Sequence, residues 1–214
     1  MASVAILCMT LALMNSICIS LAFDTRPLLD FCVTDPIGIG KCKVKKAVTA
    51  NDFFMSGLDR PGPFNSYGVA PVIASAATTP GFNTMGQTYH QAELAPNGYL
   101  PPHLHPRASE VITVLEGTME VGFVTSYPDY KYYSKVLNKG DAIIIPLGLL
   151  HTVRNVAIGK SVITVSFNSQ NPGFIFIPDS LFAAKPAINS TYLAAAFKLD
   201  EKTVKDLQTK LWYM

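Results

Sequence analysis

The chain has 214 residues, and its 17 lysines and arginines nearly balance its 15 acidic residues, which leaves a formal net charge of +2. This balance argues against nucleic acid or another polyanion as a partner. Hydrophobic residues make up 49% of the chain and charged residues only 15%, which excludes a disordered protein, and the length suits one globular domain.

The first 22 residues have the features of a secretory signal peptide. No charged side chain precedes Asp24, and residues 4–21 are almost entirely apolar. Small residues at Ser20 and Ala22 fit cleavage after Ala22, which would leave a mature chain over residues 23–214. About 20 apolar residues can also span a bilayer, so an uncleaved membrane anchor is the alternative. We expect no other membrane-spanning segment.

Removal of this segment would leave two cysteines, Cys32 and Cys42, in an oxidising compartment. Two thiols in that setting usually form a disulfide, and a loop this short would stabilise the fold by about 2 to 3 kcal/mol. The alternative is a pair of free thiols or half of a zinc site, although no histidine lies nearby in the sequence.

The middle of the chain, from about residue 84 to 168, has the pattern of an antiparallel β domain. In Thr118–Val124, the apolar residues Met119, Val121 and Phe123 alternate with other residues, as in a strand with one buried face. Three further segments are also predicted strands: Glu110–Leu115, Asp141–Ile145 and Ser161–Phe167. Turn residues separate them at intervals that suit a sandwich or a small barrel, so we expect an all-β fold.

The C-terminal part of the chain changes its period. After Asp200, which is a good helix N-cap, Val204, Leu207 and Leu211 recur at helical spacing, so we expect an amphipathic helix there. The sequon that begins at Asn189 predicts an N-linked glycan on an exposed loop of a secreted protein.

The residues that carry chemistry lie in two segments. In the first, His103 and His105 would point to the same face of a strand, as a shared metal ion requires. Pro106 ends that strand, so Glu110 would have to return from the next one. The second segment adds His151 after a turn that contains proline and glycine.

Three imidazoles and one carboxylate form a mixed nitrogen and oxygen donor set without thiolate. Such a set leaves two positions of an octahedral ion open, which is typical of a catalytic metal rather than a structural one. Ligand type alone accepts iron, nickel, copper or zinc as readily as manganese. The alternative is a barrel with three satisfied core histidines and no metal.

The two segments resemble the two motifs of the cupin superfamily, and their details resemble the germin-like proteins of plants. The germin-type features are the four residues between Gly98 and His103, the run Pro-Pro-His-x-His-Pro-Arg-Ala-x-Glu over residues 101–110, the segment Phe167–Gly173 and the early segment Asp30–Cys32. The resemblance covers nearly all of the mature chain, and the motifs occur in the right order and at the right distances.

This resemblance implies one domain over residues 23–214, a cupin jelly-roll β-barrel with a C-terminal α-helical extension from about residue 180. It implies Mn²⁺ as the cofactor, with His103, His105, Glu110 and His151 as the metal ligands. It also implies the disulfide and a homohexamer, built as a trimer of dimers, in the extracellular space, apoplast or cell wall.

The resemblance implies two redox activities: oxidation of oxalate with release of peroxide, and dismutation of superoxide. In oxalate-oxidising germins, one Asn directly precedes the Pro-Pro pair and another lies ten residues earlier, where their amides bind the substrate carboxylates. This chain has Leu100 and His90 at those positions. A missing donor costs about 1–3 kcal/mol for each unpaired substrate oxygen, so we expect no efficient oxalate oxidase activity. Superoxide, a small anionic substrate, needs little shaped pocket.

His90 is a candidate proton donor for superoxide dismutation if its side chain points inward, although a strand histidine is more often an ordinary packed or surface residue. No other catalytic residue follows from the sequence. The alternative function is non-catalytic: an apoplastic, cell-wall or receptor-like binding protein in plant defence or development, whose metal forms part of a ligand site.

Overall fold

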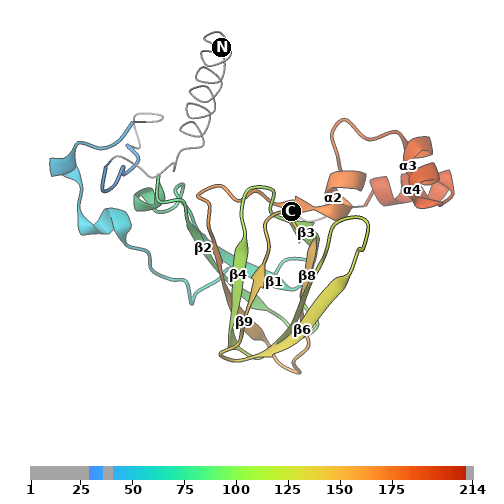
Figure 1. Ribbon diagram of the computed structural model, residues 1–214, viewed down its shortest axis with the longest axis horizontal. Coiled ribbons are helices and arrows are strands. Elements are labelled where there is room, and N and C mark those ends of the chain that lie inside the picture. Colours follow the sequence, from blue (N-terminus) through green and yellow to red (C-terminus); the bar gives the residue numbers. More distant parts are fainter. Residues whose placement is uncertain (1–28, 36–40, 211–214) are drawn as a thin grey trace, which may run out of the picture. The chain divides into compact units, whose positions relative to one another are not determined.

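The computed structural model describes residues 29–35 and 41–210 (Figure 1). The predicted signal peptide lies outside these residues, and so does Leu211. The chain from Phe31 onward forms one compact unit, which contains the fold and the site described below. Within the described residues, no helix is long and apolar enough to cross a membrane.

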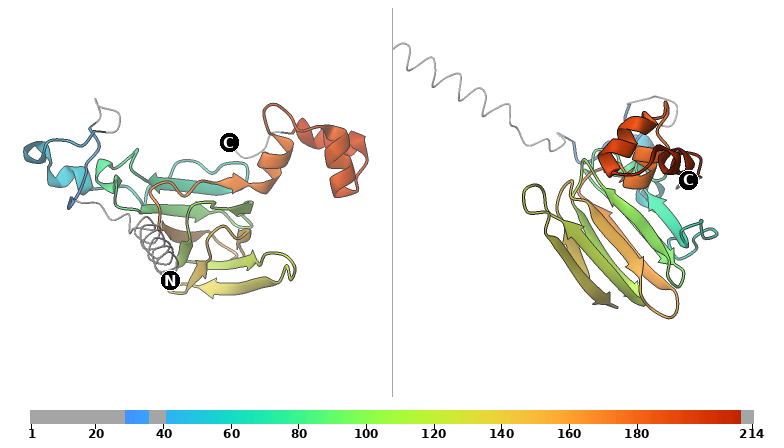
Figure 2. Two further views of the ribbon diagram at one scale, coloured as in Figure 1. Left: turned by 45° about the horizontal axis from the view of Figure 1, so that its top comes forward. Right: turned by 90° about the vertical axis from the view of Figure 1, so that its right-hand side faces the viewer.

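Two antiparallel sheets of five strands each make up the fold, with the orders β1-β2-β9-β4-β7 and β10-β3-β8-β5-β6. The strands are β1 (Val69–Ala74), β2 (Thr88–Leu94), β3 (Tyr99–Leu104), β4 (Glu110–Glu116), β5 (Thr118–Val124), β6 (Tyr132–Asn138), β7 (Ala142–Ile145), β8 (His151–Asn155), β9 (Ser161–Phe167) and β10 (Ile175–Phe176). The sheets face each other (Figures 1 and 2), and each joins strands that are distant in the sequence, such as β2 with β9 and β3 with β8. Each described strand forms hydrogen bonds only with strands of its own sheet. The expected all-β jelly roll is therefore confirmed, in the form of two facing sheets.

The four strands whose bounds the sequence pattern predicts lie close to those bounds. Thr118–Val124 and Ser161–Phe167 are β5 and β9 with the predicted bounds. β4 continues one residue beyond the predicted Glu110–Leu115, and β7 begins one residue after the predicted start of Asp141–Ile145. The β-type patterns and the turn residues between them therefore located these four strands to within one residue.

A continuous apolar core fills the space between the sheets. Leu94 and Ile112 of the first sheet and Met119 and Val121 of the second are completely buried, and they belong to one cluster. Side chains of a strand alternate between its two faces, so each sheet directs one apolar face toward the other.

Three α-helices follow the strands: α2 (Ile177–Phe182), α3 (Ser190–Phe197) and α4 (Glu201–Gln208). The predicted cap of α4 is present, because the Asp200 carboxylate accepts a hydrogen bond from the backbone N–H three residues on, at 2.8 Å. The Asn189 side chain caps α3 in the same way, also at 2.8 Å. α3 and α4 lie side by side and bury Leu193 and Val204 (Figure 1). Among the described residues, the 3-10 helices η1 (Lys45–Ala47) and η2 (Ala50–Phe53) precede β1, and η3 (Pro80–Phe82) lies between β1 and β2.

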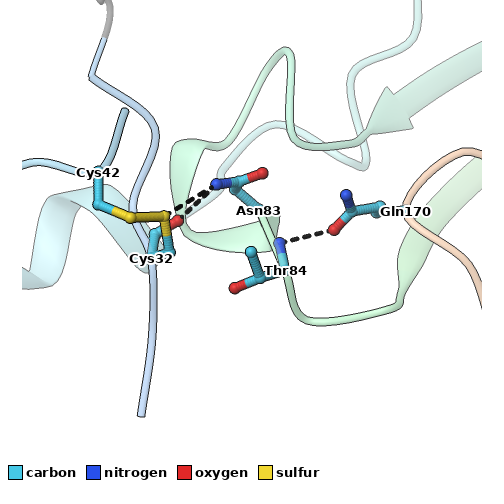
Figure 3. Close-up of a disulfide and its surroundings, with 5 residues drawn as sticks. All are labelled: Cys32, Cys42, Asn83, Thr84 and Gln170. Atoms are coloured by element: carbon cyan, nitrogen blue, oxygen red, sulfur yellow. Dashed lines mark hydrogen bonds between the residues drawn. A yellow bond between two sulfur atoms is a disulfide. The ribbon is translucent and has the colours of Figure 1, made fainter. Parts of the chain in front are cut away.

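Cys32 and Cys42 form the expected disulfide, with Cα atoms 5.0 Å apart (Figure 3). The side-chain amide of Asn83, at the end of η3, donates a hydrogen bond to the Cys32 carbonyl at 2.8 Å. The next residue, Thr84, donates its backbone N–H to the Gln170 side chain at 2.6 Å. These contacts connect the disulfide segment to the loop that follows β9, which lies beside the site described next.

Candidate metal centre

The four predicted ligands come from three segments of the chain and meet between the two sheets. His103 on β3 and His151 at the start of β8 face each other as partners on adjacent strands of the second sheet. His105 directly follows β3, and Glu110 begins β4 of the first sheet. The chain leaves the second sheet at Pro106 and returns in the first, which is the path that brings the carboxylate back to the histidines.

The four groups are buried and close enough to share one ion. Their exposed fractions lie between 0 and 4%. One ligand atom from each, taken together, gives a set whose members all lie within 4.8 Å of one another. The Oε2 atom of Glu110 is 3.2 Å from Nε2 of His105 and 3.0 Å from Nε2 of His151.

Backbone carbonyl groups fix the tautomer of each imidazole. In all three histidines Nδ1 lies within hydrogen-bonding distance of a carbonyl oxygen, which can only accept. The pairs are His103 with Pro101 at 2.8 Å, His105 with Gly173 at 2.7 Å and His151 with Leu149 at 3.0 Å. Each Nδ1 therefore carries the proton, and each Nε2 keeps a lone pair that is free to bind a metal.

The atoms at the centre of this set have no hydrogen-bond partner of their own. Nε2 of His105, Nε2 of His151 and Oε2 of Glu110 are buried and unpaired among the residues that the structure describes. A buried polar atom without a partner costs about 1–3 kcal/mol, and lone pairs that face one another at about 3 Å add repulsion. A cation shared by these atoms removes both costs, so the donor set fits a metal ion.

The protonation states also suit a metal. Burial, reinforced by the neighbouring His151, lowers the pKa of His103 to about 3. Burial alone would raise the pKa of Glu110. In the tautomer that carries its proton on Nε2, His105 and His151 would donate hydrogen bonds that outweigh burial and lower this pKa to about 2, and a cation in the place of those protons acts in the same direction. At neutral pH the structure therefore presents a neutral His103 and an ionised carboxylate, which are the forms that bind metal ions.

A cavity of about 280 Å³ lies beside the donor set, and His103 and Glu110 form part of its wall. Most of the remaining lining is apolar, including Leu100, Ile112, Val153, Val165, Phe167 and Phe174. Both positions at which oxalate-oxidising germins carry an Asn, Leu100 and His90, line this cavity. The structure thus places both residues in the wall of the cavity that His103 and Glu110 also line.

His90 points into this region rather than to the surface. It lies on β2, is 9% exposed, and its ring stacks on Phe174 and packs edge-on against Phe167, with ring centroids 5.8 and 5.1 Å away. Burial, the largest influence, lowers the pKa of His90 to about 4. The side chain is therefore neutral at pH 7, so it can offer an N–H hydrogen bond but not the proton of an imidazolium.

The loop over residues 168–174 has a role that sequence reasoning did not assign. Its Gly173 carbonyl orients His105, and the ring of Phe174 lies 4.4 Å from the His105 ring. The loop thus both positions a ligand and closes one side of the site with an aromatic ring.

Arg107 holds this loop in place. Its Nε donates to the Asn171 carbonyl and its Nη2 to the Asn171 side-chain oxygen, both at 2.8 Å. Gly173 has a φ of +72°, and a Cβ there would lie 2.8 Å from Arg107 and 3.0 Å from Pro106. The available signals in the sequence were the run Asn-Pro-Gly-Phe over residues 171–174 and, far from it in the chain, Arg107, but they do not reveal which backbone carbonyl reaches which histidine.

Comparisons with known proteins agree with this geometry. Residues 56–205 match the cupin family. Germin-like protein 8-11 of Oryza sativa subsp. japonica is 43% identical over 199 residues, which cover 90% of this chain and 89% of the relative. Germin-like protein 8-5 of the same organism is 40% identical over 219 residues, which cover 99% and 98% of the two chains.

A solved structure of an oxalate oxidase in complex with the substrate analogue glycolate is similar to this fold, with a TM-score of 0.82 at 36% identity. The match covers 87% of this chain and 97% of that chain. A solved oxalate decarboxylase from Bacillus subtilis, with a TM-score of 0.61 at 19% identity, shares the fold over 72% of this chain and 38% of its own. With its fold, its buried donor set and its relatives in agreement, the chain belongs to the cupin family and, within it, to the germin-like proteins.

Proposed function

We propose that this germin-like protein binds manganese outside the cell and uses it to dismutate superoxide. The observation that carries the proposal is the buried set of three Nε2 lone pairs and one carboxylate beside a cavity. Four protein ligands leave coordination positions for a small anion. Because the donor types accept several metals, the choice of manganese rests on the resemblance to germins.

Bound manganese would supply the one-electron chemistry that superoxide dismutation requires. The residues of this chain have the tasks of holding and shielding the ion. The carbonyls of Pro101, Leu149 and Gly173 keep the Nδ1 protons in place, so that every Nε2 stays available. The apolar cavity walls limit the entry of water, and a neutral His90 offers at most an N–H hydrogen bond to an anion in the cavity.

We propose that the protein oxidises oxalate poorly, although a similar solved structure is an oxalate oxidase. Leu100 presents a hydrocarbon side chain where a dicarboxylate needs a hydrogen-bond donor. His90, packed between Phe167 and Phe174, replaces an amide that has both a donor and an acceptor. Each substrate oxygen left unpaired costs about 1–3 kcal/mol, which is enough to suppress turnover by one to two orders of magnitude.

The proposal extends to location and assembly. A disulfide between Cys32 and Cys42 is typical of a secreted protein, which supports cleavage of a signal peptide after Ala22 and residence in the apoplast or cell wall.

Asn189 is exposed, and its side-chain oxygen caps α3, so a glycan would attach at the nitrogen of the same amide. A homohexamer, built as a trimer of dimers, is the assembly that the family resemblance favours. The intact mass of the protein from culture medium, before and after glycosidase, and light scattering test these points.

A second function deserves a test because the cavity is larger than superoxide requires. A non-catalytic germin-like protein would use the metal and the cavity to bind an organic ligand in the apoplast. Such a protein would bind manganese with the same residues but would show neither redox activity.

The decisive experiment assays the purified, metal-analysed protein for superoxide dismutation and for oxalate-dependent peroxide in parallel. We expect dismutation in proportion to bound manganese and no peroxide from oxalate, with a His151→Ala variant as the metal-depleted control. Efficient oxalate oxidation would overturn the selectivity argument. Inactivity of the manganese-loaded protein in both assays would favour the binding function.

A further inference from the structure

The cavity beside the donor set is far larger than a diatomic anion needs. Its volume is about 280 Å³, whereas one water molecule in the liquid takes up about 30 Å³. Ile73 and Phe174 line the cavity and are 48% and 41% exposed, so the cavity reaches the surface at these residues. An organic molecule can therefore enter the space that superoxide would leave mostly empty.

The lining of the cavity divides into a few polar side chains and a larger number of apolar ones. Polar side chains are few among the described lining residues: His103 and Glu110 of the donor set, together with His90 and Gln91. No lysine or arginine of the described chain lines the cavity. The other lining residues are aliphatic or aromatic, and they include Val69, Leu100, Ile112, Val153, Ile163 and Phe167.

This division selects one class of ligand. The negative charge of a ligand carboxylate can be balanced by a cation only at the donor set, where a metal ion would be held by residues that include His103 and Glu110. A second carboxylate would meet no cation in the described lining and at most the neutral donors of His90 and Gln91, so dicarboxylates are disfavoured. An apolar body, in contrast, gains from contact with the remaining walls, because its surface leaves water.

We propose that the cavity binds a monocarboxylate with an apolar body, its carboxylate toward the metal and its hydrocarbon part among the apolar walls. The proposal rests on the metal site of the proposed function, and it adds the class of ligand. Leu100 is the specificity-determining residue in this arrangement, since it is half-buried in the wall next to the donor set. The same side chain that disfavours oxalate therefore favours an apolar acid.

Four small probes test the proposal by calorimetric titration of the manganese-loaded protein: hexanoate, acetate, adipate and 1-hexanol. We expect hexanoate to bind at least tenfold more tightly than acetate, because each fully buried methylene group improves affinity about fourfold. Adipate has the same chain length with a second carboxylate, and 1-hexanol has the chain without a charge. Both should bind at least tenfold more weakly than hexanoate.

A matched pair of variants locates the binding site. Leu100→Asn should weaken hexanoate binding about tenfold while it leaves acetate binding nearly unchanged. Leu115→Asn makes the same change on β4 at a side chain that is 41% exposed and does not line the cavity, so its hexanoate affinity should equal that of the wild type. Equal losses in both variants would show that the apolar contact lies elsewhere and would overturn the proposal.

The outcomes separate this inference from the proposed function. A manganese-loaded protein that dismutates superoxide but binds hexanoate no better than acetate, or adipate as well as hexanoate, overturns the inference alone. Selective hexanoate binding without dismutation supports the inference and rejects the dismutase proposal. A protein that holds no metal, as metal analysis before the titration would reveal, overturns both, because the carboxylate then has no cation in the cavity.

Discussion

Replacing His90 with Phe should make the metal-free protein more resistant to acid. His90 is buried, and burial lowers its pKa from 6.5 to about 4. The unfolded chain therefore takes up a proton near pH 6.5, whereas the folded protein does so only near pH 4. A folded-state pKa that lies below the unfolded value means that stability is lost as the pH falls between these two values. Phe cannot titrate, so the variant escapes this loss.

The size of the effect follows from the two pKa values. At pH 4.5 the unfolded state binds almost a full proton at this position and the folded state only a fraction, which costs the wild type about 2.5 kcal/mol relative to pH 7.5. Phe has a similar shape and keeps the ring contacts with Phe167 and Phe174. His103 and Glu110 titrate in both proteins, so their contributions cancel in the difference.

Urea unfolding followed by circular dichroism at pH 7.5 and pH 4.5 measures this difference, with the disulfide intact and the protein concentration fixed. The unfolding free energy of His90→Phe minus that of the wild type should rise by about 2.5 kcal/mol at the lower pH. His90→Gln, which is polar but does not titrate, should show the same pH dependence on a lower baseline. A difference that does not change with pH would refute the placement of a neutral, buried imidazole beside the site.

The remaining predictions concern the loop, the substrate and the disulfide. Arg107→Met should speed the loss of metal to a chelator by up to about tenfold, because the loop that orients a ligand histidine is released, and Arg107→Lys should restore part of the difference. Equal rates in all three proteins would contradict this role. The double change Leu100→Asn with His90→Asn should gain a small oxalate-dependent release of peroxide, since two amides restore orientation without the packing that holds them; no gain would remove these residues as the cause of selectivity. Cys32→Ser should lower the unfolding free energy by about 2 to 3 kcal/mol in urea titrations, and an unchanged value would show that the bridge does not stabilise the fold.

Much of the fold was predictable because its signals are local. Alternation in Thr118–Val124 and the β-type composition of Ser161–Phe167 predicted both strands with their bounds, and the Asp200 cap located α4. α3 was not predicted from its own pattern, because its apolar residues are not concentrated on one face. Its N-cap, Asn189, was read only as a glycan acceptor.

The donor set was predictable for a different reason. His103 and His105 are two residues apart on an extended chain, which places them on one face, and Pro106 forces the return that brings in Glu110. The carbonyl partners of the imidazoles, such as that of Gly173, depend on tertiary contacts between distant segments and leave no local signal. The cavity is likewise a property of packing between two sheets, so its volume could not be read from any one strand.

Metal content per chain is the measurement that tests the central claim most directly. Protein purified from the extracellular medium should contain close to one manganese ion per chain by mass spectrometry of the elements. The His105→Ala variant should lose most of it, because one of four ligands to a shared ion is gone. Wild-type protein that takes up no manganese, or a folded His105→Ala variant that retains a full complement, would contradict the account.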